Sequence, residues 1–561
     1  MESNLLGRYL PRIDFDSYKD FKENFNINIP ENFNFGFDIV DEYARLDPEK
    51  VALVWCDDND DEETFTFEDL KRYSNKAANF LRALGIGKGD SVMLMLKRRY
   101  EYWYMIVALH KLGAVAIPGT HMLTARDLEY RSNAAGIKMI ITADDEHLMD
   151  AVDESQAESP TLKHKVVIRG ARDDWHDLDL AMQKASDVFE RPTGPEATTN
   201  DDTMLLYFTS GTTGMPKMVR HDNTYPLGHI LTAKYWQNVQ DNGLHLTVAD
   251  TGWAKTAWGK IYGQWIAGSA VFVYDYNNKF DAKKMLTVLE RYSVTTFCAP
   301  ATVYRMLVRE DLTEYDLKHL KHLCVAGEPL YPEVFASVQE AMGLSIHEGF
   351  GQTETAVALA NFPWMEVKPG SMGKPSPSYD VELLDEDGLP CADGEEGEII
   401  FHTEIRKPFG MFCEYYNNPK ITRSAWSNGI YRTGDIAWRD KDGYYWYVGR
   451  ADDAIKSSGY KIGPFEVESA LQEHPAVHEC AVTGTPDPVR GQVVKATIVL
   501  SEGYTASDEL VKELQDHVKK ITAPYKYPRV IAFTESLPKT ISGKISRRTI
   551  KHADLEKVMM G

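Results

Sequence analysis

Apolar residues in the first quarter of the chain switch between helical and strand spacing. From Leu70 to Leu84 they recur every three or four residues, and Thr66 followed by Asp69 is typical of a capping box at a helix start. The run SVMLML at 91–96 is continuously apolar, as expected of a strand buried on both faces. Helix-like and strand-like stretches then alternate at 101–112, 114–118, 124–134 and 138–142. This alternation predicts an α/β domain with a parallel sheet.

The pattern changes near residue 450. The stretches ECAVTG (479–484) and VVKATIVL (493–500) are typical of strands, and apolar residues from Leu510 to Ile521 mark one amphipathic helix. We therefore predict a large, multi-sheet α/β N-terminal domain of residues 1–450 and a small α+β C-terminal domain of residues 451–561.

Composition narrows the class of protein. The 561 residues include 11 Trp, 29 Tyr and 22 Phe, enough to fill a core, so disorder is not favoured. The formal net charge of −22 argues against a nucleic-acid-binding surface, which needs a basic face. The segment Lys519–Lys551 reverses this locally, with nine Lys or Arg and one acid, Glu535. It is either a solvated face or a patch that meets phosphates.

Cysteine usage and the N-terminus suggest a compartment. The six cysteines show no CxxC spacing, so we expect reduced thiols rather than disulfides or structural zinc. The first 21 residues resemble neither a secretory signal nor a typical transit peptide. No stretch of about 20 apolar residues occurs, so integral membrane association is not expected. The sequence thus predicts a soluble, cytoplasmic protein.

The segment YFTSGTTGMPK, from Tyr207 to Lys217, has the residue types of a phosphate loop. Glycines let backbone N–H groups approach phosphate oxygens, hydroxyls add donors and lysine adds charge. It is not a Walker A loop, because Pro216 and Met218 occupy positions where that motif needs other residues. A plain Gly/Thr turn is the alternative. His221, which follows the loop, has either a structural or a ligand-binding role.

The segment TSGTTGMPK resembles the signature of adenylate-forming enzymes, the superfamily of acyl-CoA synthetases, adenylation domains and firefly luciferase. Five further segments resemble later motifs of that superfamily in the right order, and the resemblance spans about 50–550. They are AGEPL (326–330), EGFGQTE (348–354), YRTGD (431–435), GRADDAIKSSGYKIGPFEVE (449–468) and PKTISGKISRR (538–548). The segment ADTGWAKTAWG (249–259) is similar to the medium-chain acyl-CoA synthetase branch.

The resemblance implies a reaction in two steps. A carboxylate attacks the α-phosphate of ATP to give acyl-AMP and pyrophosphate, and the thiol of coenzyme A then displaces AMP to give a thioester. It further implies Mg²⁺ as cofactor and a C-terminal domain that rotates on a hinge at Asp452 between the two steps. Lys544 would be catalytic, its ammonium bridging the attacking carboxylate and the α-phosphate.

By the same resemblance, Glu354 would hold Mg²⁺, Asp435 would accept both ribose hydroxyls, and Arg450 would reach the ribose or a phosphate. The whole implied ATP-binding set is Thr209, Ser210, Gly211, Thr212, Thr213, Gly214, Lys217, Gly327, Glu328, Pro329, Glu348, Gly349, Phe350, Gly351, Gln352, Thr353, Asp435 and Arg450. The acyl group would meet Trp253, Lys255 and Gly351. Coenzyme A would meet Ser458, Gly459, Tyr460 and Arg490.

Two positions depart from the family pattern. Lys461 stands in GYKI where many members have Arg, and it replaces a bidentate fork by a point charge. Gly351 stands where acetate-activating members carry Trp. A glycine there predicts open space in the acyl pocket and a substrate larger than acetate.

The function implied is therefore that of an ATP-dependent ligase joining a medium-chain or branched-chain carboxylic acid to coenzyme A. An aromatic-acid ligase of the benzoate type is the near alternative, because both need a roomy apolar pocket. An amino-acid-activating adenylation domain is a further alternative, but it needs a carboxylate in the pocket, where this chain offers Lys255. A silent nucleotide-binding sensor is disfavoured by the joint presence of Lys544, Glu354 and Asp435. The oligomeric state stays open, with a homodimer as one candidate.

Overall fold

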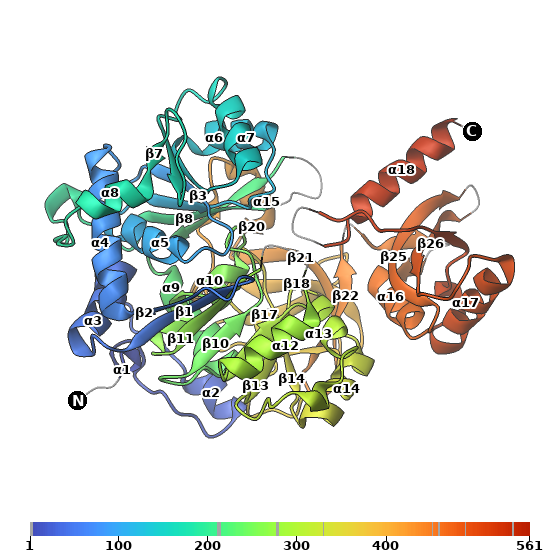
Figure 1. Cartoon of the computed structure of the whole chain (residues 1–561). Coiled ribbons are helices and arrows are strands. Elements are labelled where there is room, and N and C mark those ends of the chain that lie inside the picture. The colour runs from blue at the N-terminus through green and yellow to red at the C-terminus, as the bar shows by residue number, and fades with distance from the viewer. Residues whose placement is uncertain are drawn as a thin grey trace. The chain divides into compact units, whose positions relative to one another are not determined.

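The structure is a computed structural model that describes residues 4–209, 215–276, 280–328, 330–451, 453–457, 460–487, 490–540 and 544–560. The chain divides into two compact units, coloured from blue to red along the sequence in Figure 1. The first unit contains residues 1–211, 215–380 and 403–428, and the second contains 212–214, 381–402 and 429–561. The sequence analysis placed a domain boundary at residue 450, defined by rotation of the C-terminal domain. The division into compact units does not test rotation, so that boundary stays a prediction.

One sheet of the first unit has the strand order β19-β9-β8-β4-β3-β5-β6-β7. Its strands are β3 (Ser91–Met95), β4 (Val115–Pro118), β5 (Ile137–Ala143), β6 (His164–Ile168), β7 (His176–Asp177), β8 (Thr203–Thr209), β9 (Lys217–Asp222) and β19 (Glu414–Tyr415). The strands from β8 to β7 run parallel, and β9 lies antiparallel to β8. The predicted parallel sheet is confirmed, and all five residues of β3 are buried, as its continuous apolar run requires.

A second set of strands in the first unit follows the order β16-β15-β14-β13-β12-β10-β11-β1-β2. Their bounds are β1 (Val51–Asp57), β2 (Glu62–Thr66), β10 (Leu244–Thr247), β11 (Ala270–Asp275), β12 (Thr296–Ala299), β13 (His322–Ala326), β14 (Ile346–Phe350), β15 (Leu359–Ala360) and β16 (Ser371–Pro375). The strands β1, β11, β10, β12, β13 and β14 are parallel to one another. Their carboxyl ends therefore meet at one edge, where open α/β sheets bind ligands.

The helices of the first unit cover these strands (Figure 1). They are α1 (Leu6–Tyr9), α2 (Tyr18–Asn24), α3 (Glu42–Leu46), α4 (Phe67–Ala83), α5 (Glu101–Leu112), α6 (Ala125–Ala135), α7 (Glu146–Gln156), α8 (Leu178–Lys184), α9 (Tyr225–Ile230), α10 (Lys255–Gly259), α11 (Tyr262–Ile266), α12 (Ala282–Arg291), α13 (Ala301–Leu307), α14 (Pro332–Met342) and α15 (Pro419–Ala425). The predicted capping box is present: Thr66 and Asp69 exchange hydrogen bonds at the start of α4. Leu289, Val303 and Phe335 of α12, α13 and α14 pack on the strand residues Phe297 and Leu323.

The second unit contains an antiparallel set of strands and a smaller α+β part. The first set is β17 (Asp380–Leu384), β18 (Glu396–His402), β21 (Ile430–Arg439) and β22 (Tyr445–Arg450), in that order. The α+β part has β23 (Ile455–Ser457), β24 (Tyr460–Ile462), β25 (Val477–Asp487), β26 (Gly491–Leu500), β27 (Val530–Phe533), α16 (Pro464–Gln472), α17 (Asp508–Ile521) and α18 (Arg547–Met560). Leu471, Val482, Leu514 and Val518 lie in its core. The predicted α+β character of the C-terminal residues is confirmed.

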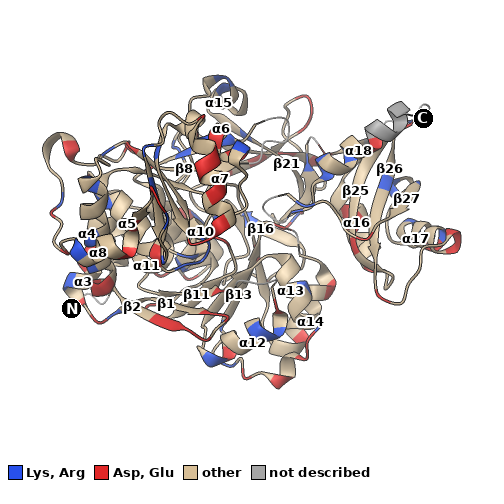
Figure 2. Ribbon diagram, turned by 45° about the horizontal axis from the view of Figure 1, so that its top comes forward, with Lys and Arg blue, Asp and Glu red and all other residues tan. Residues whose placement is uncertain are grey.

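The basic segment of the second unit is largely paired. Figure 2 shows blue positions along α18. The ion pairs are Lys519–Asp516, Lys526–Glu466, Lys539–Glu479, Arg547–Glu468 and Lys551–Asp453. These cations are neutralised within their own unit, so most of the segment is a structural, ion-paired face.

Candidate active site

The two ends of the expected phosphate loop lie opposite each other. Strand β8 ends at Thr209 and strand β9 begins at Lys217, and these residues pair in antiparallel register. The intervening Ser210, Gly211, Thr212, Thr213 and Gly214 lie outside the described residues. The hairpin therefore places a hydroxyl and a cation side by side where the loop starts and ends.

Lys217, Tyr415 and Glu354 come together at this hairpin. The Lys217 ammonium lies 5.0 Å from the centre of the Tyr415 ring, and the Tyr415 hydroxyl donates to Glu354 Oε1 at 2.7 Å. Strand β19, which carries Tyr415, pairs with β9, so the sheet itself brings the phenol to the lysine. A hydrogen-bonded carboxylate is held in one orientation, as metal ligands commonly are.

Glu354 fits Mg²⁺ only together with a nucleotide. The described residues contain no group of three His, Cys, Asp or Glu side chains that would hold a metal alone. Mg²⁺ typically takes one or two carboxylates and fills its remaining positions with water and phosphate oxygens. A single oriented carboxylate beside a phosphate loop meets that requirement.

The backbone around Glu354 is fixed by buried neighbours. The amide of Phe412 donates to the Glu354 carbonyl at 2.7 Å, and His221 Nε2 lies 2.8 Å from the carbonyl oxygen of Thr353. Burial lowers the pKa of His221 to about 3, so the ring is neutral and its Nε2–H donates. This contact with the Thr353 carbonyl favours the structural alternative for His221 over the ligand-binding one.

Strands β13 and β14 end side by side where the adenine wall is expected, with Ala326 opposite Gly349. Gly327 has a φ of +94°, in the region that favours glycine. The Glu328 carboxylate accepts a hydrogen bond from Thr302 Oγ1 at 2.5 Å, so its side chain is directed to the start of α13. Pro329 lies outside the described residues. Gly327 thus leaves bare backbone at the expected position of the base, whereas a Cβ atom on Gly349 would lie 2.6 Å from the Trp236 ring.

Glu348 is the buried acid of this wall. It is 5% exposed, and its Oε2 has no hydrogen-bond partner among the described residues. Burial raises the pKa of Glu348 to about 8. The carboxyl group is therefore mostly protonated at pH 7 and can both donate and accept a hydrogen bond.

Replacing Glu348 with glutamine should remove a pH dependence of stability. Because the folded pKa of Glu348 lies above the unfolded value of 4.5, the native state holds a proton that the unfolded state loses. The free energy of unfolding should therefore fall as pH rises from about 4.5 to 8, by about 1.4 kcal/mol per pH unit. Urea denaturation of wild type and Glu348→Gln at pH 6, 7 and 8 measures the difference. Parallel curves for the two proteins would show that Glu348 is ionised throughout.

Helix α10 spans the ends of β13 and β14. Its Lys255 Nζ donates to the carbonyl oxygen of Ala326 at 2.8 Å. Trp258, at the other end of the helix, is 7% exposed and packs edge-on against Trp236 at a centroid distance of 6.0 Å. Trp253 lies half-buried in the turn before the helix. Lys255 thus brings the ADTGWAKTAWG segment beside the expected position of the base.

The open space expected beside Gly351 is not there. A Cβ atom on Gly351 would lie 2.4 Å from Cη2 of Trp258 and 2.6 Å from the carbonyl oxygen of Ala356. The indole that the sequence lacks at position 351 is supplied from α10 instead. The sequence analysis missed Trp258, although it is the second tryptophan of ADTGWAKTAWG, because nothing in the local pattern shows which residue faces Gly351.

In the second unit, Asp435 and Arg450 face each other on the paired strands β21 and β22. Arg450 Nη1 lies 3.1 Å from Asp435 Oδ2 and donates to the Thr433 carbonyl at 3.0 Å. The Tyr447 hydroxyl donates to Asp435 Oδ1 at 3.3 Å. An ionised carboxylate can accept several hydrogen bonds, as binding of two ribose hydroxyls would require. Arg450 therefore orients and neutralises Asp435.

Lys544 is described shortly before the start of α18. The Thr540 amide donates to the Lys544 carbonyl at 2.7 Å, and Lys539 and Ile545 form a β-bridge around it. The Lys544 side chain is exposed and makes no ion pair with any described residue. Unlike the neighbouring lysines, it is available to an anion.

The remaining expected sites are described only in part. Asp452, Ser458 and Gly459 lie outside the described residues. Tyr460 begins β24. Arg490 is exposed, and its amide donates to Asp487 Oδ1 at 2.8 Å. The hinge and the coenzyme A contacts stay predictions.

Comparison with known proteins identifies the family. The family described as AMP-binding enzyme matches residues 40–416, and its C-terminal domain matches residues 466–544. The chain belongs to the AMP-binding enzyme family. The residues at the β8–β9 hairpin, the β13 and β14 ends and α10 all fall within the first match.

Relatives of this AMP-binding enzyme are similar over almost the whole chain. The mitochondrial acyl-coenzyme A synthetase ACSM3 of Mus musculus is 43% identical over 96% of this chain and 93% of its own length. The mitochondrial acyl-coenzyme A synthetase ACSM5 of Homo sapiens is 43% identical over 93% and 91%. Among solved structures, an anthranilate CoA ligase in complex with anthranoyl-AMP superposes with a TM-score of 0.86 at 28% identity, covering 95% of this chain and 99% of that chain.

The expectation of a cytoplasmic protein is contradicted, because these relatives are named mitochondrial. That expectation rested on reduced cysteines and on the first residues of the sequence. All six cysteines are free in the structure, but free thiols suit any reducing compartment and do not distinguish one from another. No described helix is long and apolar enough to cross a membrane.

Proposed function

We propose that this AMP-binding enzyme is an ATP-dependent acyl-CoA synthetase that activates a medium-chain or branched-chain carboxylic acid through an acyl-AMP intermediate. The observation that carries the proposal is the meeting of Lys217, Tyr415 and Glu354 at the β8–β9 hairpin. A cation and an oriented carboxylate at one end of a glycine-rich loop are what a nucleotide triphosphate with Mg²⁺ requires. The names of the relatives support the same reaction.

In this proposal each group has one task. Lys217 and the loop residues hold the β- and γ-phosphates, and Glu354 holds Mg²⁺, which offsets phosphate charge when bound. Asp435, oriented by Arg450, accepts the ribose hydroxyls. Lys544 places its ammonium between the substrate carboxylate and the α-phosphate, where two anions must approach each other. Rotation at Asp452 then replaces Lys544 by the coenzyme A contacts of Ser458, Gly459, Tyr460 and Arg490.

The acyl group is proposed to lie against α10. Lys255 of this helix lies beside Gly327, Trp258 packs on Gly351, and Trp253 precedes the helix in the same segment. Lys255 argues against an amino-acid substrate, because its ammonium would repel the substrate's own. An aromatic acid is the second candidate, supported by the likeness to the anthranilate CoA ligase.

One assay tests the proposal and separates the candidates. AMP release is measured with ATP, Mg²⁺ and coenzyme A against acids from acetate to decanoate, with 2-methylbutyrate and benzoate. We expect coenzyme A-dependent turnover that peaks at a medium-chain or branched acid. A peak at benzoate would favour the aromatic alternative, and no turnover with any acid would contradict the proposal.

Replacing Trp258 with alanine should shift the substrate preference toward acids with a longer chain. The indole is the side chain nearest to Gly351. We expect its removal to open space for about two further methylenes. Each buried methylene contributes about 0.8 kcal/mol, so kcat/KM should rise about tenfold for acids two carbons longer. The KM for ATP should not change. An unaltered chain-length profile in a folded variant would show that Trp258 does not border the acyl group.

A further inference from the structure

The turn before α10 is tied to a distant part of the first unit by one arginine. Arg98, which follows β3, places Nη1 3.4 Å from Asp250 Oδ2. Its Nη2 donates to the carbonyl oxygen of Tyr276, and its guanidinium carbon lies 4.0 Å from the centre of the Tyr276 ring. The Arg98 side chain is 12% exposed. The guanidinium is thus held from three sides and has little freedom to follow a displaced partner.

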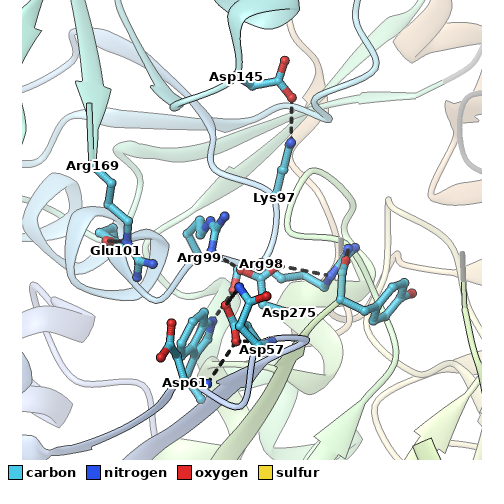
Figure 3. A network of polar contacts seen from close by, with 12 residues as sticks. Asp57, Asp61, Lys97, Arg98, Arg99, Glu101, Asp145, Arg169 and Asp275 are labelled. Atoms are coloured by element: carbon cyan, nitrogen blue, oxygen red, sulfur yellow. Dashed lines mark hydrogen bonds and ion pairs between the residues drawn. The ribbon is translucent and has the colours of Figure 1, made fainter. Parts of the chain in front are cut away.

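A second carboxylate, that of Asp275, lies beside the arginine without a hydrogen bond to it (Figure 3). Asp275, at the end of β11, is 1% exposed and lies 3.8 Å from Arg98 Nε and 3.2 Å from Arg99 Nη1. Trp55 Nε1 donates to the Arg98 carbonyl at 3.0 Å. Removing one member of such a buried charge cluster leaves the others uncompensated. The position of Arg98 is therefore set by β1, β3 and β11, elements outside the candidate active site.

Asp250 connects Arg98 to the turn through hydrogen bonds. Its Oδ1 accepts from the Gly252 amide at 3.0 Å, and its carbonyl accepts from Thr256 Oγ1 at 2.9 Å. Gly252 lies so close to Thr120 that a Cβ atom would be 2.4 Å from the Thr120 amide nitrogen. Lys260 Nζ donates to the Ala249 carbonyl at 2.8 Å. The turn and α10 are therefore linked by hydrogen bonds into one segment, Ala249–Gly259. We call Asp250 its charged anchor, because its carboxylate binds Arg98.

A small displacement of the Ala249–Gly259 segment would move Lys255 and Trp258, which it contains. Lys255 reaches the Ala326 carbonyl and Trp258 packs on Gly351, so both ends of α10 touch the candidate site. A displacement of about 1 Å in a substrate-positioning group costs roughly 10²-fold in rate. The charged anchor is thus placed to control the shape of the acyl pocket without touching the acyl group.

We propose that Arg98 is a positioning residue for acyl selection, which holds the Ala249–Gly259 segment in place through its ion pair with Asp250. The inference rests on the proposed acyl-CoA synthetase function. It predicts that Arg98 affects which acid is used and leaves the use of ATP unchanged.

The same network offers a matched control. Arg169 binds the buried Glu101 through two nitrogens, at 2.5 and 3.3 Å, and its guanidinium carbon lies 4.3 Å from the centre of the Tyr100 ring. Arg169 is 31% exposed and Glu101 2%, against 12% for Arg98 and 13% for Asp250. The pair makes no hydrogen bond or ion pair with the Ala249–Gly259 segment in the described structure. Arg169→Gln should lower the melting temperature without altering acyl selection.

The experiment compares Arg98→Met, Arg98→Lys, Asp250→Asn and Arg169→Gln. For each folded variant, kcat and KM are measured for the best acid of the wild type, for acetate and for ATP. We expect Arg98→Met and Asp250→Asn to lower the selectivity ratio of best acid over acetate by ten- to a hundredfold, within the roughly 10²-fold scale of misplacement. Arg98→Lys should restore part of the ratio, because it keeps the charge. The double variant Arg98→Met/Asp250→Asn should lower the selectivity ratio no further than either single variant does.

Three outcomes would overturn the inference: an unchanged ratio in Arg98→Met, an equal loss in Arg169→Gln, or additive losses in the double variant. If Arg98→Met does not fold, Asp250→Asn and Arg98→Lys decide the question. A wild type that turns over no acid would instead contradict the proposed function, so the two failures are distinguishable.

Discussion

Replacing Lys544 with alanine should slow acyl-AMP formation by about 10²–10⁴-fold, the scale of losing a preorganised electrostatic group. The carboxylate and the α-phosphate are both anionic, and the exposed Lys544 ammonium has no competing ion pair among the described residues. Pyrophosphate release in the presence of ATP and acid measures this step. Thioester formation from supplied acyl-AMP and coenzyme A should largely survive, because we assign that step to other residues.

Lys539→Ala is the matched control. Lys539 lies in the same basic segment and forms a β-bridge with Ile545, but its ammonium is 3.0 Å from Glu479. Replacing Lys539 removes one positive charge from the basic segment but keeps the ammonium of Lys544. Equal slowing by the two variants, or equal loss of both half-reactions in Lys544→Ala, would show that general basicity rather than Lys544 is responsible. Acetylation of Lys544, which removes its charge, should reproduce the alanine variant.

Mild acid should unfold the protein, because several buried histidines are neutral in the native state. Burial lowers the pKa to about 3 for five described histidines: His110, His221, His229, His245 and His322. An unfolded histidine binds a proton below about pH 6.5, whereas these native ones do not. Their stabilisation is therefore present above pH 6.5 and is lost as pH falls below it, by up to about 2 kcal/mol per histidine at pH 5.

Urea denaturation between pH 5 and 8 tests this expectation. With a total stability of about 5–15 kcal/mol for an ordinary protein, losses of this size should bring the acid transition to about pH 5. His229→Phe removes one ring, whose Nε2 has no partner among the described residues, and should flatten the acid slope. The exposed His319 provides the control, since His319→Gln should leave the slope unchanged. Identical slopes for wild type and His229→Phe would contradict a neutral buried His229.

Short-range signals in the sequence determined the elements that the structure contains. Thr66 and Asp69 cap α4, the apolar run at 91–96 forms β3, and the helix expected at 101–112 is α5 with the same bounds. These predictions hold because hydrogen bonds of a cap and the burial of one element depend on residues a few positions apart. The motif residues at 209–217 and 348–354 likewise indicated the family, because the residues that give a loop its function are consecutive in the sequence.

Contacts between distant segments were decided only by the tertiary structure. Tyr415 was not expected at Glu354, yet the pairing of β19 with β9 brings it there. The glycine at position 351 predicted open space, but Trp258 from another element fills it. Arg98 carried no motif, and its link to Asp250 exists because β3 and the turn before α10 meet in the fold. Periodicity predicts which face of an element is buried but not what packs against it, so the surroundings of Gly351 follow from packing alone.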